Sequence, residues 1–192
     1  ESLMAFFYLL TLYCFIRGAV SRRRNPWYLL SVFFCFMGMG SKEAMVSVPL
    51  VTLAYDRLFL ASSFDEIVKR RWGVYLGYFA SWGLLAFLIS CQPPITQETI
   101  GFNIKEVTPL TYLLTESQAI LRYLQLSFLP FGLCVDYAWP FVQNIKEAIF
   151  PGSAVFTLLG LAGWAVYRRK QAGFLGVWFF LILVPTSSFL PI

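Results

Sequence analysis

Three groups of polar and charged residues interrupt long apolar runs, and these are the positions at which chemistry could occur. They are Lys42 with Glu43 after a glycine-rich turn, Arg122 inside the segment from Leu110 to Pro130, and Asp136 just after that segment. Charged groups in apolar surroundings are costly unless they are paired or functional. A guanidinium such as Arg122 can grip a phosphate through paired hydrogen bonds. We therefore expect Lys42, Glu43, Arg122 and Asp136 to bind substrate.

Each of these residues also has a structural interpretation. Lys42 and Glu43 could form a solvated turn, with Ser41 capping the next helix. Arg122 could extend its charged end towards lipid headgroups, as long basic side chains do. Asp136 could be an ordinary carboxylate of a loop or helix cap. The residue types alone leave both interpretations open.

Other kinds of chemistry are excluded for this chain. It contains no histidine, so it cannot supply a histidine base, an imidazole ligand or a Ser-His-Asp triad. Its four cysteines are far apart, without the CxxC spacing of zinc and redox sites. Gly38-Met39-Gly40 lacks the GK[ST] signature of a phosphate-binding loop. The sequence thus predicts no metal site and leaves the catalytic residues unknown.

The composition indicates an integral membrane protein. Of the 192 residues, 58% are hydrophobic and only 13% are charged, against about 25% in a typical soluble domain. Mean hydropathy is +0.67. The net charge of +5 comes from short basic clusters between apolar runs rather than from a recognition helix, so we expect no nucleic-acid partner. The expected surroundings are membrane lipids.

About six apolar runs are long enough to form membrane-crossing helices. They are residues 2–20, 27–40, 44–60 with a kink at Pro49, 73–91, 151–166 and 173–183. Residues 61–72 are polar and basic and predict a separate amphipathic helix on the cytoplasmic surface. The positive-inside rule places three basic clusters in the cytoplasm. These clusters are Arg22 to Arg24, Lys69 to Arg71 and Arg168 to Lys170.

The segment from Leu110 to Pro130 is long enough to cross a membrane but has a polar stripe. At about 100° per residue, its threonines, glutamines and Arg122 fall on one narrow face. A single crossing here would move the cluster Arg168 to Lys170 outside the cell, against the positive-inside rule. We therefore predict an interfacial helix on the external side. Lys42 and Asp136 are expected on that side too.

The sequence shows no internal repeat and no linker, which predicts a single membrane domain over residues 1–192. The chain begins at Glu1, directly before an apolar run, and ends at Ile192 just after another. We expect it to be an interior fragment of a longer protein. The predicted fold class is all-α, a polytopic bundle of about six transmembrane helices with one interfacial amphipathic helix.

Three short motifs, in order along the chain, resemble the polytopic GT-C glycosyltransferases. They are Gly40-Ser41-Lys42-Glu43 with Val48-Pro49-Leu50 and Tyr55-Asp56, then Ile120-Leu121-Arg122-Tyr123-Leu124 with Leu129-Pro130-Phe131-Gly132-Leu133 and Asp136, then Val184-Pro185-Thr186-Ser187-Ser188-Phe189-Leu190-Pro191. The likeness is strongest to membrane proteins that join an O-mannosyltransferase-like domain to tetratricopeptide repeats.

This resemblance implies a multi-pass enzyme of the bacterial inner membrane that transfers a sugar from a polyprenyl-phosphate donor to an acceptor on the periplasmic face. Lys42 and Glu43 would face the donor, and Arg122 would neutralise the departing lipid phosphate. The family commonly uses a divalent metal and an acidic base in an early external loop. That loop is expected before Glu1, so activity would depend on the full-length protein.

Two alternatives come from other functional classes. The chain could be a non-catalytic structural subunit of a larger membrane complex, with other membrane subunits as its partners. It could also be a transporter, which the lack of repeats and of charges inside the predicted spans makes less attractive.

Overall fold

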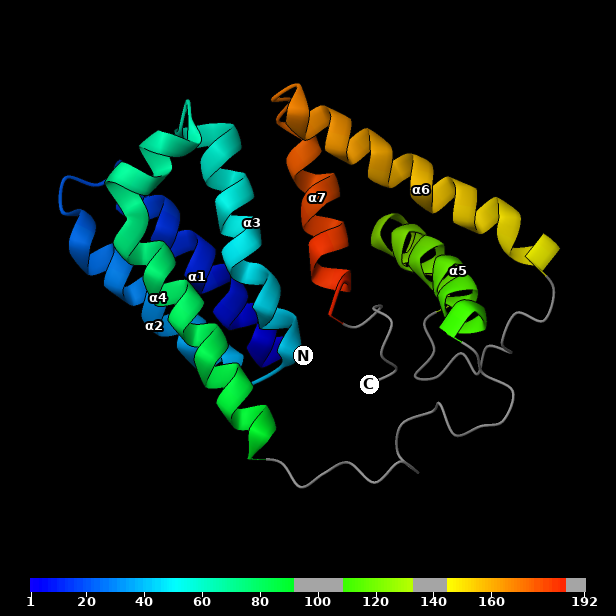
Figure 1. The fold of residues 1–192 in the computed structure, drawn as a ribbon, viewed down its shortest axis with the longest axis horizontal. Helices are drawn as coiled ribbons and strands as arrows, with labels where there is room; N and C mark the ends of the chain where they lie inside the picture. The colour runs from blue at the N-terminus through cyan, green and yellow to red at the C-terminus, as the bar shows by residue number, and fades with distance from the viewer. Residues whose placement is uncertain (92–108, 133–144, 186–192) are drawn as a thin grey trace. The chain divides into compact units, whose positions relative to one another are not determined.

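The computed structural model describes residues 1–91, 109–132 and 145–185, and every regular element within these ranges is helical (Figure 1). In chain order the elements are α1 (Ser2–Val20), α2 (Arg24–Met39), the 3-10 helix η1 (Glu43–Ser47), α3 (Val48–Tyr55), the π-helical turn η2 (Asp56–Leu60), α4 (Phe64–Ser90), α5 (Pro109–Phe128), α6 (Ile145–Tyr167) and α7 (Ala172–Leu183). The all-α prediction is confirmed.

The chain forms two compact units. Within the described residues, the first unit contains α1 to α4, the end of α6 from Ala162 onwards, and α7. The second contains α5 and α6 up to Leu161. A single membrane domain over residues 1–192 stays a prediction.

The first unit is built on the pairing of α1 with α2, which lie side by side (Figure 1). The two helices approach closely because Gly18 has no side chain. A Cβ atom at Gly18 would lie 2.6 Å from the ring of Tyr28. Small residues at such contacts are typical of helix packing inside membranes.

The run from 44 to 60 forms three consecutive helical pieces instead of one kinked helix. The 3-10 helix η1 leads into α3, and α3 ends in the wider turn η2. Pro49 lies in the first turn of α3, where a missing backbone N–H breaks no helical hydrogen bond. The predicted kink at Pro49 is therefore replaced by a change of helix type.

Helix α4 joins two segments that the sequence predicted as separate. The expected surface helix (61–72) and the expected span (73–91) form one continuous helix of 27 residues. Its start is fixed by side-chain capping, since the Glu66 N–H donates to Ser63 Oγ over 3.3 Å and the Glu66 carboxylate accepts the Ser62 N–H over 3.1 Å and the Ser62 hydroxyl over 2.9 Å. These hydrogen bonds from Ser62 lower the pKa of Glu66. The separate surface helix was a wrong prediction.

The turn between α6 and α7 is a Schellman motif. The Lys170 N–H donates to Ala165 O over 2.7 Å and the Arg169 N–H donates to Val166 O over 2.9 Å. Arg169 takes the left-handed position of the motif, with φ of 53°. Glycine is usual at this position, but the Arg169 side chain donates to Ser62 O over 2.5 Å. This bond ties the turn to the start of α4.

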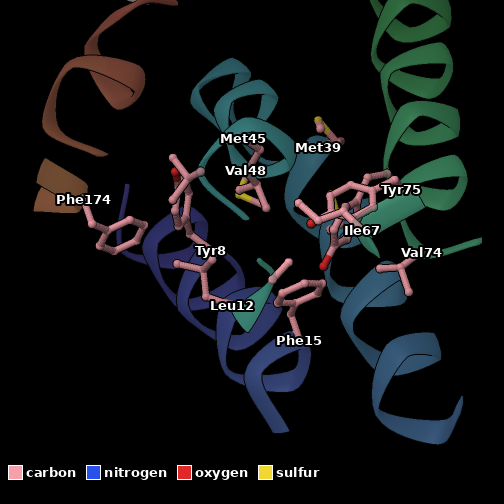
Figure 2. Close-up of a cluster of buried hydrophobic side chains, with 14 residues drawn as sticks. Tyr8, Leu12, Phe15, Met39, Met45, Val48, Ile67, Val74, Tyr75 and Phe174 are labelled. Carbon is pink, nitrogen blue, oxygen red and sulfur yellow. The ribbon is translucent and has the colours of Figure 1, made fainter. Parts of the chain in front are cut away.

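The first unit has polar groups in its interior and large apolar side chains on its surface. Its buried cluster combines aliphatic and aromatic residues from α1, α3, α4 and α7 with tyrosine hydroxyls that are hydrogen-bonded (Figure 2). Ser31 Oγ donates to Thr11 O over 2.6 Å and lies 2.6 Å from Tyr78 Oη. The outward faces carry apolar residues such as Leu76, 59% exposed. In water, faces of this kind would be unfavourable.

Two helices among the described residues are long and apolar enough to cross a membrane by length and composition. They are Ser2–Val20 and Ile149–Tyr167. Helix α7 is apolar but shorter. The number of about six crossings stays a prediction. Helix α2, one of the expected spans, has 16 residues and would extend for only about 24 Å.

We predict that Gly77 and Gly83, both in α4, respond oppositely to alanine. A Cβ atom at Gly77 would lie 2.8 Å from both methyl groups of Val32 in α2, whereas Gly83 has nothing within 4 Å. Gly83→Ala should stabilise by about 0.5–1 kcal/mol through helix propensity. Gly77→Ala should destabilise by about 1–3 kcal/mol through overpacking. Unfolding by dodecyl sulfate in mixed micelles, followed by circular dichroism, measures both, and equal responses would contradict the α2–α4 contact.

Candidate functional site

Lys42 and Glu43 lie at the junction between α2 and η1. Lys42 has an extended backbone, with φ of −165°, and Glu43 begins the 3-10 helix. The Lys42 Nζ donates to Glu1 Oε1 over 2.7 Å, with 32% of the Lys42 side chain exposed. This hydrogen bond lowers the pKa of Glu1. An exposed ion pair of this kind contributes little to stability, so the ammonium can exchange its partner at low cost.

The two ends of the first unit differ in charge. The Arg71 Nε donates to Tyr28 Oη over 3.2 Å, and Arg169 bonds to Ser62, so three basic clusters share one end. This basic end contains Arg22 to Arg24, Lys69 to Arg71 and Arg168 to Lys170. Helix α1 runs from Glu1 to the cluster Arg22 to Arg24 and α2 runs from that cluster back towards Lys42, which places the Glu1–Lys42 pair at the opposite end of these two helices.

Arg122 connects two parts of the second motif on which the family resemblance is based. Its Nη1 donates to Gln125 Oε1 over 2.9 Å, and its Nη2 donates to Phe131 O over 3.1 Å and to Gly132 O over 3.2 Å. Gly132 has φ of 68°, a left-handed conformation that favours glycine. The guanidinium therefore holds the chain that follows α5 against the last turns of the helix.

The four predicted binding residues are distributed over different parts of the chain. Lys42 and Glu43 are neighbours in the first unit, and Arg122 belongs to the second. Asp136 lies outside the described residues. Within the described ranges, no three carboxylates or thiolates gather closely enough to hold a metal ion. The divalent metal that the resemblance implies stays an expectation.

The most deeply buried charges belong to a cluster that the sequence reasoning missed. Asp56 in η2 is fully buried, and Arg71 in α4 is 8% exposed. The Arg71 Nη1 donates to Asp56 Oδ1 over 2.6 Å, and Tyr75 Oη donates to Asp56 Oδ2 over 2.9 Å. Arg71 also reaches Tyr28 in α2. The cluster joins α2, η2 and α4 and satisfies both carboxylate oxygens.

Arg71 was predicted to lie on a helix at the cytoplasmic surface, and its burial corrects that prediction. The sequence signal for this burial was the helical spacing of Arg71. It shares one face of α4 with Ile67, Val74 and Tyr78, which are all buried. The sequence pattern of that face is recognisable only when residues 64–72 are read as part of the same helix as residues 73–90.

We predict that removing one member of the Asp56–Arg71 pair is much worse than removing both. Arg71→Met leaves a buried carboxylate without its cation and should destabilise by about 3–5 kcal/mol. Asp56→Leu combined with Arg71→Met should recover most of that loss, because apolar replacements of a buried pair are often tolerated. Dodecyl sulfate unfolding of the two single variants and the double variant measures the coupling. Additive losses would show that the pair does not act as a unit.

Comparison with protein-family models, with curated proteins and with solved structures finds no match to this chain. The likeness to GT-C glycosyltransferases thus depends on the three motifs alone.

Proposed function

We propose that the chain is a multi-pass integral membrane protein, with the basic end of the first unit in the cytoplasm. The support is the distribution of polarity, since hydrogen-bonded polar groups lie among the apolar side chains of the interior while many further large apolar side chains face outwards. Helices in lipid pack in this way because lipid tails, unlike water, solvate apolar surface. Helix α6 fits the same pattern, with Phe150 77% and Phe156 76% exposed.

The shorter helices can be part of this arrangement. Helices α2 and α7 can cross the hydrocarbon core when polar or aromatic residues at their ends lie at the headgroup level. They can also cross where the bilayer thins locally. The basic residues before α2 and before α7 are suited to that level. On this basis the proposed number of crossings remains about six.

We further propose that the chain is the membrane part of a glycosyltransferase that uses a polyprenyl-phosphate sugar. The observation that carries this proposal is the position of Lys42 and Glu43. These residues of the first GT-C-like motif lie opposite the basic end, which corresponds to the external side where the resemblance expects the donor.

The reaction requires charge stabilisation by the protein. An acceptor hydroxyl oxygen attacks the anomeric carbon, the bond from that carbon to the phosphate oxygen breaks, and the lipid phosphate leaves with the electron pair. The hydroxyl proton passes to an acidic base, which the family resemblance assigns to an early external loop. The same resemblance implies that Lys42 and Glu43 face the donor and that Arg122 neutralises the lipid phosphate as it leaves.

A structural role is the second candidate, and a specific observation favours it. Both cations of the proposed donor site already have partners, since Lys42 pairs with Glu1 and Arg122 holds backbone carbonyl oxygens. A degenerate family member kept for its packing surfaces in a larger membrane complex would show the same contacts. An activity measurement separates the two functions.

We predict opposite accessibility at the two ends of the first unit. Ser41→Cys, beside Lys42, should react with a membrane-impermeant maleimide in intact cells. Arg168→Cys, at the basic end, should react only after permeabilisation. Cysteine-free protein carrying one of these cysteines provides the measurement, with cysteine-free protein alone as the control. Labelling of both sites in intact cells would contradict the proposed orientation.

We predict that Lys42→Ala and Arg122→Ala each reduce sugar transfer by at least tenfold in the full-length protein, because each removes a charge that stabilises the leaving phosphate. Transfer from a polyprenyl-phosphate mannose donor in isolated membranes is the measurement. Lys69→Ala is the matched control, since Lys69 is an exposed lysine at the basic end.

A conservative variant of Arg122 separates phosphate binding by its charge from its role in holding the chain after α5. Arg122→Lys keeps the charge but cannot hold two carbonyl oxygens with one planar group, so part of the transfer should survive if the charge matters. Normal transfer by both alanine variants would refute the proposed site. Absence of transfer by the unaltered full-length protein would favour the structural role.

A further inference from the structure

A pocket of about 420 Å³ opens between α2 and α4 at the basic end of the first unit. Asn25, Tyr28 and Arg70 contribute polar groups to its wall, and Leu29 and Val32 contribute apolar ones. The pocket belongs entirely to the first unit. It also lies at the end opposite Lys42, so it is not the donor site proposed above.

The pocket exists because α2 and α4 run in the same direction and meet unevenly. Hydrogen bonds at successive levels join Tyr28 to Arg71 and Ser31 to Tyr78. Beside the second of these bonds, Val32 packs against Gly77, where an added Cβ atom would lie 2.8 Å from its methyl groups. One turn nearer the basic end, a Cβ atom at Gly73 would meet nothing within 4 Å. The missing side chain at Gly73 leaves the space open.

The rim of the pocket is suited to the boundary between lipid tails and headgroups. Trp72 lines it and is 63% exposed, and Leu29 lines it and is 70% exposed. Tryptophan is enriched at this depth of membranes, because its ring is apolar and its N–H is polar. Deeper in the pocket, Val32 and Val74 provide an apolar surface along which an acyl chain can lie.

The charge around the pocket is positive. Arg71 is balanced by the buried Asp56, and Arg70 is partly balanced by Glu66 at 3.0 Å. Arg22 to Arg24 precede Asn25, and Lys69 precedes Arg70. The two clusters beside the pocket, Arg22 to Arg24 and Lys69 to Arg71, contribute six basic residues, and the acidic residues near them are Asp56, Asp65 and Glu66. Basic pockets between membrane helices on the cytoplasmic side attract anionic headgroups.

We propose that this pocket binds one anionic glycerophospholipid, with its phosphate at Arg70, Asn25 and Tyr28 and an acyl chain along Leu29 and Val32. A soluble phosphate would use the rim alone and leave the apolar floor uncovered. A zwitterionic lipid would cover the floor but gain less from the positive rim. The inference rests on the membrane location proposed above and is independent of sugar transfer.

The test uses the complete chain in phosphatidylcholine vesicles that contain a small, equal fraction of either brominated phosphatidylglycerol or brominated phosphatidylcholine. Bromine quenches tryptophan fluorescence on contact. The difference between the unaltered protein and Trp72→Phe isolates the signal of Trp72. Selective binding should make brominated phosphatidylglycerol about fivefold more effective at Trp72 than brominated phosphatidylcholine, the gain expected from one basic contact.

Matched variants test whether the lipid selectivity arises in the pocket. Arg70→Gln should remove most of the selectivity, whereas Lys69→Gln, with the same change of charge one residue away and outside the pocket, should keep it. Gly73→Phe should fill the pocket and remove the selectivity. Gly83→Phe, at the other open glycine of α4, should leave it unchanged.

Several results would overturn the proposal. These are equal quenching by the two brominated lipids, equal losses for Arg70→Gln and Lys69→Gln, and displacement of phosphatidylglycerol by glycerol 3-phosphate alone. Resistance of the protein to carbonate extraction is measured in parallel. Protein that inserts but lacks lipid selectivity refutes the pocket alone, and protein that fails to insert refutes the membrane location.

Discussion

The buried ion pair between Asp56 and Arg71 is the constraint on which the first unit depends. It joins the π-helical turn η2 to α4, and through Tyr28 it also fixes α2. A buried carboxylate must keep its partners, since losing them leaves an uncompensated charge. The register of α4 against α2 therefore has little freedom. That register determines that Val32 meets Gly77 and that the pocket at Gly73 lies one turn away.

The hydrogen bonds around this pair explain how a unit with apolar outer faces can have a defined interior. Close packing and interhelical hydrogen bonds hold helices together where no water drives them together. Ser31 with Tyr78 and Tyr8 with Ser47 provide such bonds between elements distant in the sequence. The glycines bring the backbones close enough for these short side chains to reach. Small residues and hydroxyls thus act together in the packing.

Part of this architecture could be predicted from the sequence because it depends on local signals. The bounds of α1 follow from its apolar run and the arginines after it, and the spacing of Ser63 and Glu66 marks the start of α4. The pairing of Asp56 with Arg71 could not be predicted in the same way. The two residues are joined only by tertiary packing, and the polar character of residues 61–72 favoured a separate surface helix. Likewise, the sequence of the second motif did not reveal that Arg122 binds the carbonyl oxygens of Phe131 and Gly132.

The two cations of the proposed donor site are held in different ways, and this difference matters for phosphate binding. Lys42 pairs with a carboxylate, so an incoming phosphate must displace Glu1, at small cost because the pair is exposed. Arg122 donates to oxygens of Gln125, Phe131 and Gly132, and these hydrogen bonds orient the guanidinium. An oriented cation needs little reorganisation when negative charge develops nearby. The orientation of Arg122 thus suits the role that the resemblance implies for it, and the exposed ammonium of Lys42 suits contact with the donor.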